Sequence, residues 1–251
     1  MMEERQKLWR ARLMGDDETC ARKRELYHRF IKGRASQDAV VRQQIRADMP
    51  RTFVGVEQVD RVNVETLLLS YAAVQQGDGY LQGFNYIMAI VLYVFHESQE
   101  CHADTWWCFS RIVGLVRPLM PDFNVAWFHW CRRQWFGEFH RRLRRRRPVL
   151  ESILHQKQEE WSTLMTVRWF MIWFAQTVAF DELPVLWDFI IVQPPKSLMR
   201  VYTQVAFAIV EEAATTVAYE AGDSVPETMH RMLTLRVQGV ADLLERVRRR
   251  L

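Results

Sequence analysis

Apolar residues recur along most of this chain at the spacing of an α-helix. Between residues 61 and 76, Val64, Leu67, Leu68 and Tyr71 fall at positions i, i+3, i+4 and i+7, so they share one helical face. No segment shows the apolar–polar alternation that predicts a half-buried strand. The same criterion predicts helices over residues 3–14, 18–32, 37–48, 61–76, 83–96, 103–117, 123–144, 157–179, 183–191, 197–219 and 226–249.

Glycine and proline residues separate these predicted helices. Gly15 and Gly33 follow the first two, and Pro50 ends the third because the residue before a proline avoids the helical conformation. Further prolines lie at or near the later gaps: Pro118, Pro121, Pro148, Pro184, Pro194, Pro195 and Pro226. The pattern therefore predicts a single all-α, multi-helical domain over residues 1–251, with no significant β-sheet.

The composition is that of a globular protein with a bulky core. Of the 251 residues, 49% are hydrophobic and 12% aromatic, with ten Trp and fourteen Phe. These proportions exclude a disordered chain. The net charge of +4 comes mostly from arginine, and it permits an acidic partner or an anionic membrane surface without requiring either.

The cysteines and the N-terminal segment indicate a cytoplasmic protein. Cys20, Cys101, Cys108 and Cys131 show no C-x-x-C spacing, which is typical of reduced thiols. The first residues, MMEERQKLWR, lack the apolar stretch of a signal peptide. We therefore expect a cytoplasmic location.

One uncharged segment, Gly79 to His96, approaches the length of a membrane-spanning helix. It contains Gln82, Gly83 and Asn85 close to its start, and polar groups of this kind are costly in lipid. The segment is therefore predicted to be a buried core helix rather than a transmembrane one.

Several kinds of chemistry are absent from the sequence. There is no glycine-rich phosphate-binding loop and no G-x-S-x-G nucleophile motif. The group of His96, Cys101, His102 and Cys108 has an irregular spacing that matches no zinc motif. We expect no metal site and no cofactor of the chain's own.

Residues 141–148, RRLRRRRP, form a dense basic run. Such a run is usually the solvated end of a long helix. The functional alternatives are contact with an anionic membrane surface or with an acidic protein partner. No nucleic acid is expected, because no aromatic platform accompanies the run. The residues concerned are Arg141, Arg142, Arg144, Arg145, Arg146 and Arg147.

Two short motifs stand out when they are taken together. Ile45-x-x-Asp48-x-x-Arg51 lies at the end of a predicted helix, and Tyr80-x-Gln82-Gly83 opens a later one. Alone, an arginine at a helix end most often contacts solvent or a carboxylate. In this order, with Asn85 after the second motif, the pair resembles the TBC domain family of GTPase-activating proteins for Rab-type small GTPases.

The resemblance extends over most of the chain. RQKLWRARLMG at residues 5–15 looks like the opening helix of that family. RPLMPDFN at 117–124 and RWFMIWFAQTVAFDELPVLWD at 168–188 look like its middle and later segments. The family fold is entirely α-helical, in agreement with the periodicity of the apolar residues.

The resemblance implies a role for each motif residue. Arg51 would be an arginine finger supplied in trans, and Gln82 would position the attacking water in place of the GTPase's own glutamine. Asp48, one helical turn before Arg51, would hold the guanidinium. Tyr80, Gly83 and Asn85 would be supporting residues. The partner implied is a Rab-type GTPase that carries GTP and magnesium, on vesicle-trafficking membranes.

Three alternatives stay open at this point. A TBC fold can be a catalytically inactive binding module for a small GTPase or a trafficking partner. Pro50, directly before Arg51, either preorganises the finger or misdirects it. Gly83 serves either to let another backbone approach closely or to permit a strained turn.

Overall fold

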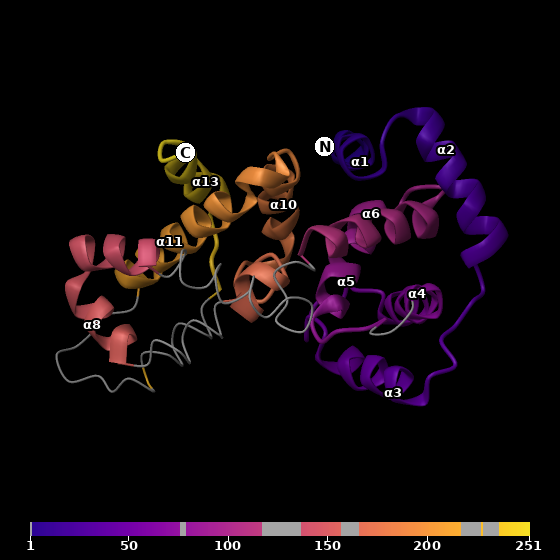
Figure 1. Ribbon diagram of the computed structural model, residues 1–251, viewed down its shortest axis with the longest axis horizontal. Helices are drawn as coiled ribbons and strands as arrows, with labels where there is room; N and C mark the ends of the chain where they lie inside the picture. The colour runs from indigo at the N-terminus through magenta and orange to yellow at the C-terminus, as the bar shows by residue number, and fades with distance from the viewer. Residues whose placement is uncertain (1, 76–78, 117–136, 157–165, 217–226, 228–235) are drawn as a thin grey trace. The chain divides into compact units, whose positions relative to one another are not determined.

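The computed structural model describes residues 2–75, 79–116, 137–156, 166–216, 227 and 236–251 (Figure 1). The chain divides into two compact units, Met1–Leu115 and Val116–Leu251. The described residues form helices and no β-strand, with one isolated bridge between Val178 and Val237. The predicted all-α fold class is confirmed. The expectation of one domain over the whole chain stays a prediction.

The first unit contains the helices that position the two sequence motifs. They are α1 (Met2–Trp9), α2 (Asp17–Leu26), α3 (Ala39–Asp48), α4 (Arg61–Val74), α5 (Phe84–Phe95) and α6 (Cys101–Val116). Shorter turns extend the first three: π-helical turns at Arg10–Met14 and Tyr27–Ile31, and a 3-10 turn at Met49–Arg51. The helices predicted for this part of the sequence are confirmed, with their ends shifted by a few residues.

Aspartate side chains determine where α3 and α4 begin. The Asp38 carboxylate accepts a hydrogen bond from the N–H of Val40 at 2.8 Å, and Asp60 accepts one from the N–H of Asn63 at 3.0 Å. These bonds satisfy backbone donors that have no partner within the first turn of a helix. Helix α3 therefore starts at a fixed residue, and Asp48 is the last residue of this helix.

Helix α5 is the buried centre of the first unit (Figure 1). Ile87, Ile90 and Val94 are fully buried, and the helix packs against α4 and α1. A helix that is apolar on every side belongs in a protein core or a membrane. Here it is a core helix, as predicted, and none of the helices in the described ranges is long and apolar enough to span a bilayer.

A buried carboxylate joins three helices of this unit. Asp104 of α6 has no solvent exposure, and its oxygens accept hydrogen bonds from Arg10 at 3.0 Å and from Arg24 at 2.7 and 2.8 Å. The bond to Asp104 raises the pKa of the Arg24 guanidinium. This carboxylate therefore holds α2 and the π-helical turn that follows α1 against α6.

The second unit is built around an aromatic core. Its helices are α8 (Pro148–Gln156), α10 (Leu183–Ile191), α11 (Leu198–Thr216) and α13 (Val240–Arg248), and residues 137–146 are also helical. Helix α13 packs on both α10 and α11. Trp173, Trp187 and Tyr202 are fully buried beside one another, with Trp173 and Trp187 in edge-to-face contact. Of the predicted helix 123–144, only residues 137–144 lie within the described ranges, and these are helical.

The predicted helix 157–179 is wrong at its C-terminal end. Residues Thr166–Met171 form a π-helical turn, but residues 172–177 are turns. Trp173 and Phe174 have positive φ angles of 48° and 63°. The carbonyl oxygen of Trp173 accepts a hydrogen bond from the indole N–H of Trp187 at 3.0 Å, so it is not used in a continuing helix. A tertiary contact therefore overrides the local helical pattern.

Two further differences concern α13, which begins later than predicted, and α8, which was not predicted. The predicted helix 226–249 is wrong over residues 236–239, which are not helical. Helix α13 begins at Val240 because the Glu182 carboxylate accepts hydrogen bonds from the N–H groups of Gly239 and Val240, at 2.8 and 2.5 Å. Helix α8 was not predicted, and Pro148, which the pattern places in a gap between helices, is its first residue. Proline is well suited to the first position of a helix.

Replacing Asp104 tests the buried ion cluster. Asp104→Asn leaves Arg10 and Arg24 facing a neutral amide, so we expect the free energy of unfolding to fall by about 3 kcal/mol. Chemical denaturation of the variant measures this change. Glu18→Gln, which removes an exposed carboxylate from α2, is the control and should change stability little. An equal effect of both variants would contradict the structural role of Asp104.

Candidate functional site

The first motif ends in a short turn that presents Arg51 to solvent. Helix α3 ends at Asp48, and Met49–Arg51 continues it as a 3-10 turn with Pro50 among its first positions. Pro50 has no N–H to donate to the preceding helical turn, so the α-helical hydrogen-bond pattern of α3 ends here and the chain tightens into this 3-10 turn. The Arg51 side chain is 56% exposed. Pro50 is therefore compatible with the turn that carries the proposed finger.

The carboxylate of Asp48 holds Arg51 from the protein side. Asp48 is 3% exposed, and its Oδ1 accepts hydrogen bonds from Nε of Arg51 at 2.6 Å and from Nη2. This interaction raises the pKa of the Arg51 guanidinium. A guanidinium has five N–H donors, so both donors on Nη1 and one on Nη2 remain for another acceptor. The guanidinium is therefore charged and oriented, and three of its five N–H donors do not bind Asp48.

Tyr80 occupies the second oxygen of the same carboxylate. Its hydroxyl donates a hydrogen bond to Oδ2 of Asp48, and the residue is 5% exposed. Burial, and then the bond to Asp48, raise the pKa of Tyr80. The phenol therefore stays protonated over the physiological pH range and remains a donor. Both oxygens of the buried carboxylate have a partner.

Further hydrogen bonds connect the two motif segments. The Asn85 amide, 1% exposed, donates from Nδ2 to Oγ1 of Thr52 at 2.8 Å, and that hydroxyl donates to the carbonyl of Asp48 at 2.8 Å. The Tyr86 hydroxyl donates to the carbonyl of Arg51 at 3.0 Å. The structure thus brings residues 48–52 and 80–86 together, as the pairing of the motifs suggests.

Gln82 lies in the turn that leads into α5, and its side chain is exposed. It forms no hydrogen bond with any other residue in the described ranges. Gly83 follows with φ of 107°, a conformation that favours glycine. Of the two roles considered for Gly83, the geometry favours the strained turn. Close backbone approach occurs instead at Gly79, where an added Cβ would lie 2.8 Å from the Cα of Ala72.

Sequence reasoning missed part of this network. Thr52 stands next to Arg51 in the motif, but no role was expected for its hydroxyl. Arg61, at the start of α4, donates from Nη2 to the carbonyls of Thr52 and Phe53 at 2.9 and 2.7 Å. Phe53 has a positive φ of 45°, so Arg61 braces a bend directly after the arginine turn. Contacts to backbone carbonyls leave no recognisable sequence signal.

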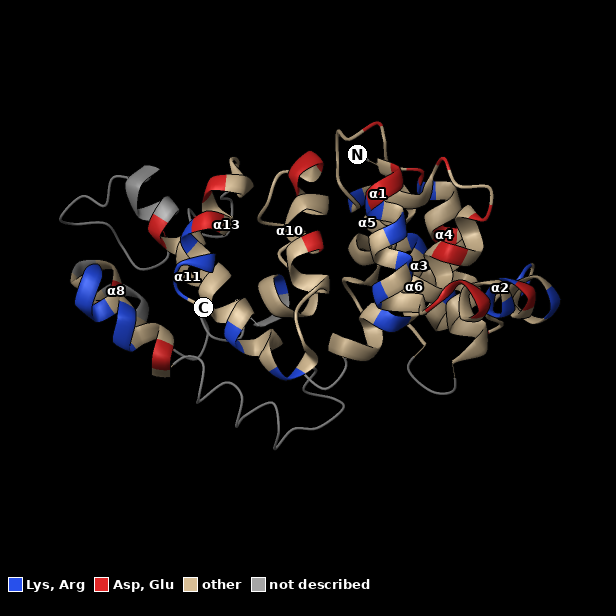
Figure 2. Ribbon diagram, turned by 90° about the horizontal axis from the view of Figure 1, so that it is seen from above, with Lys and Arg blue, Asp and Glu red and all other residues tan. Residues whose placement is uncertain are grey.

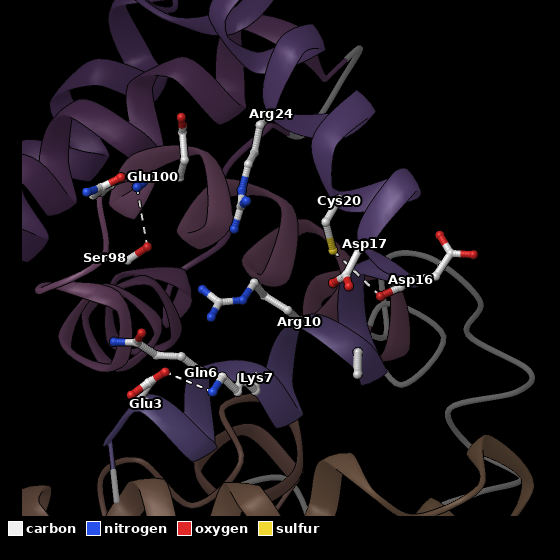
Figure 3. A pocket seen from close by; sticks show the side chains of 13 residues that line it. Glu3, Gln6, Lys7, Arg10, Asp16, Asp17, Cys20, Arg24, Ser98 and Glu100 are labelled. Carbon is white, nitrogen blue, oxygen red and sulfur yellow. Dashed lines mark hydrogen bonds and ion pairs between the residues drawn. The ribbon is translucent and has the colours of Figure 1, made fainter.

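The first unit also contains a cavity that lies apart from Arg51 and Gln82 and is lined by charged residues of both signs (Figure 3). It measures about 820 Å³ and is lined by residues of α1, of α2 and of the segment between them, and by residues 98–100. Figure 3 shows Arg10 and Arg24 pointing into it, but Asp104 already binds both guanidinium groups. On its wall, Lys7 pairs with Glu3 at 2.8 Å. Neither Arg51 nor Gln82 lines this cavity, and its charges are largely neutralised by one another.

One group of possible metal ligands exists in the described ranges, and the sequence analysis had not singled it out. The ligand atoms of His140, Glu151 and His155 lie within 4.8 Å of one another. However, the Oε1 atom of Glu151 accepts a hydrogen bond from Arg144 at 3.0 Å. A guanidinium at this oxygen, within an arginine-rich segment, disfavours a divalent cation. We therefore assign no metal to this group.

The fold and the two joined motifs define a helical TBC-type domain. A model of the Rab-GTPase-TBC domain matches residues 2–213, most of the chain. The chain therefore belongs to the Rab-GTPase-TBC domain family, and the resemblance noted from its motifs is confirmed.

The chain is similar to several proteins of this family. Human "Growth hormone-regulated TBC protein 1" is 22% identical over 209 residues, 80% of this chain and 58% of that protein. "Growth hormone-regulated TBC protein 6" of Caenorhabditis elegans is 24% identical, over 65% of this chain and 48% of that protein. This chain thus spans about half the length of these relatives.

The fold also resembles a solved structure. The crystal structure of the Ypt/Rab-GAP domain of Gyp1p superposes with a TM-score of 0.72 at 14% identity, covering 98% of this chain and 86% of that one. At this identity the likeness establishes the all-α fold alone.

Removing the Tyr80 hydroxyl tests the carboxylate network. In Tyr80→Phe, the buried carboxylate of Asp48 loses a donor, so we expect the free energy of unfolding to fall by about 2 kcal/mol. Urea denaturation provides the measurement. Tyr27→Phe is the matched control, because Tyr27 is also buried but its hydroxyl bonds to no other residue in the described ranges. If both variants lose the same stability, the Tyr80–Asp48 bond makes no specific contribution.

Proposed function

We propose that this chain accelerates GTP hydrolysis by a Rab-type small GTPase, to which it supplies Arg51 and Gln82 in trans. The observation that supports this proposal most strongly is the state of Arg51. Its guanidinium is exposed, charged and held by the buried carboxylate of Asp48, with donors left for an incoming acceptor. The buried carboxylate orients the guanidinium from one side and leaves its other donors facing solvent.

The role proposed for Arg51 is electrostatic. Negative charge spreads over the oxygens of the transferred phosphoryl group as GTP is hydrolysed, and a planar guanidinium offers several donors to those oxygens. Asp48 fixes the direction of the group before the GTPase arrives, so less side-chain entropy is lost on binding. The bond from Tyr86 to the Arg51 carbonyl fixes the backbone as well.

The role proposed for Gln82 is to position water. A carboxamide accepts one hydrogen bond and donates two, so it can orient a water molecule toward a phosphorus atom. Gln82 is exposed at the entrance of α5, and the buried residues of that helix anchor the turn. The positive φ of Gly83 sets the direction in which the chain enters α5 from this turn.

Within this proposal the chain is a GTPase activator rather than an enzyme acting alone. The nucleotide and its magnesium ion belong to the partner GTPase, and the chain needs no cofactor of its own. Its site of action would be the cytoplasmic face of endomembranes in vesicle trafficking, where Rab-type partners are found.

The competing function is a TBC-fold module that binds a GTPase or a trafficking partner without accelerating hydrolysis. The presence of both Arg51 and Gln82 favours activity, because a binding module requires neither group. A contact of the basic run with an anionic membrane or an acidic partner is compatible with either function. Much of that run is internally paired: Arg141 and Arg142 with Glu138, Arg144 with Glu151, and Arg146 with Glu211.

Single-turnover GTP hydrolysis across a panel of Rab-type GTPases tests the proposal. We expect stimulation of one or a few of them by the wild-type chain. Arg51→Ala should reduce that stimulation about 1,000-fold, because the charge that stabilises the transition state is lost. Gln82→Ala should also abolish most of it. Arg46→Ala is the matched control, since Arg46 is an exposed arginine on α3 whose only ion pair with another described residue is with Glu65.

Equilibrium binding to the GTPase separates the two functions. If wild type binds a GTPase but neither wild type nor Arg46→Ala stimulates hydrolysis, the chain is a binding module. If Arg51→Ala stimulates as well as wild type, Arg51 is not the finger. Melting temperatures of all variants show whether a loss of activity reflects a loss of fold.

A further inference from the structure

The second unit contains a cavity with almost uniformly basic walls. It measures about 310 Å³, and among the described residues its lining consists of the aromatic residue Phe207 and four arginines: Arg142, Arg145, Arg146 and Arg250. They come from the helical stretch 137–146, from α11 and from the residues that follow α13. Figure 2 shows basic positions both near the α8 label and near the C-terminus. We refer to this cavity as the arginine pocket.

The arginine pocket has unused hydrogen-bond donors. Arg145 is exposed and forms no ion pair with any other residue in the described ranges. The Nη1 atom of Arg250 is buried and has no hydrogen-bond partner there. Arg142 uses Nε and Nη1 on Glu138 and Gln204, at 2.6 and 2.5 Å, and keeps Nη2. A buried, unpaired guanidinium nitrogen is unfavourable unless a ligand or water satisfies it.

Two of the four arginines are fixed in place by neighbouring groups. Arg146 and Arg250 both pair with the carboxylate of Glu211, at 2.8 and 2.6 Å. Their guanidinium carbons also lie 5.9 and 5.4 Å from the ring centroid of the buried Phe207. Contacts at this distance are typical of cation–π interactions. The pocket is thus organised before any ligand enters.

The charge balance leaves the pocket positive. Glu211 is shared between two arginines, and Glu138 is shared between Arg142 and Arg141, which lies outside the pocket. No carboxylate lines the cavity among the residues whose side chains the structure describes. The volume exceeds by far what one water molecule requires, so an anion of several atoms fits.

We propose that the arginine pocket binds a compact phosphate anion with more than one phosphate group, such as a phosphorylated inositol. Planar guanidinium groups bind phosphate oxygens in a bidentate manner, and several of them converge here from different elements. The source of this chemistry is either a lipid headgroup or a soluble phosphate. The proposal does not depend on Arg51 or Gln82. It assigns anion binding to a defined pocket that includes Arg250, rather than to the whole basic run at residues 141–147.

Titration calorimetry of the full chain with inositol trisphosphate tests the proposal. We expect saturable binding that weakens about tenfold in Arg145→Gln, because one charged hydrogen-bonding group is lost. Arg250→Gln should weaken binding at least as much. Arg147→Gln is the matched control: Arg147 belongs to the same run, is exposed and unpaired in the described ranges, and does not line the pocket.

Flotation with vesicles identifies the source of the ligand. Phosphatidylcholine vesicles that contain phosphatidylinositol bisphosphate are compared with phosphatidylserine vesicles of equal total charge. Binding to the first alone, lost in Arg145→Gln, assigns the pocket to a lipid headgroup. Binding of inositol trisphosphate without vesicle binding assigns it to a soluble phosphate. Both outcomes support the proposal.

Three results would overturn it. These are no binding of either probe, an equal loss in Arg145→Gln and Arg147→Gln, or equal affinity for a polyglutamate peptide of the same charge. The last two would indicate diffuse electrostatic attraction or an acidic protein partner. Arg51→Ala should bind inositol trisphosphate like wild type, so failure of the phosphate site and failure of GTPase activation give different results.

Discussion

The carboxylate of Asp48 is buried at the end of α3, and the arrangement around Arg51 depends on it. A carboxylate removed from water is unfavourable by several kcal/mol unless charged or hydrogen-bonded groups surround it. Arg51 donates to one of its oxygens and Tyr80 to the other. Arg51 precedes α4 in the sequence, and Tyr80 follows it. The physical demand of one buried charge therefore brings the arginine turn and the entrance of α5 together.

Helix boundaries follow the sequence where the contacts that set them are local. The spacing of Leu67 and Leu68 predicts α4, and the apolar run predicts α5, because each pattern decides which face of its own helix is buried. The turns at residues 172–177 and the non-helical residues 236–239 were mispredicted. The first depends on the indole of Trp187 and the second on the carboxylate of Glu182, which form hydrogen bonds with these backbone segments from other parts of the chain. The local pattern of apolar residues does not predict such contacts.

The site was predictable only as a pair of motifs. Asp48, Arg51 and Tyr80 were selected through the family resemblance, and the structure brings them into contact, while their catalytic roles stay predictions. Thr52 and Arg61 act through carbonyl oxygens or short hydroxyl contacts, which many residue types can make. Exposure could not be inferred either. The difference between a buried Asp48 and an exposed Arg51 arises from packing, although they lie only one turn apart.

The bond between Glu182 and the start of α13 has a consequence for the order of folding. The donor and acceptor are separated by 57 positions, so closing this contact costs more loop-closure entropy than a contact within α13 itself. Helix α13 is short, and isolated helices of this length are marginal in water. It should therefore form late, as a docking event on an existing core. The last arginines of the chain would then reach their positions only after the rest of the second unit is complete.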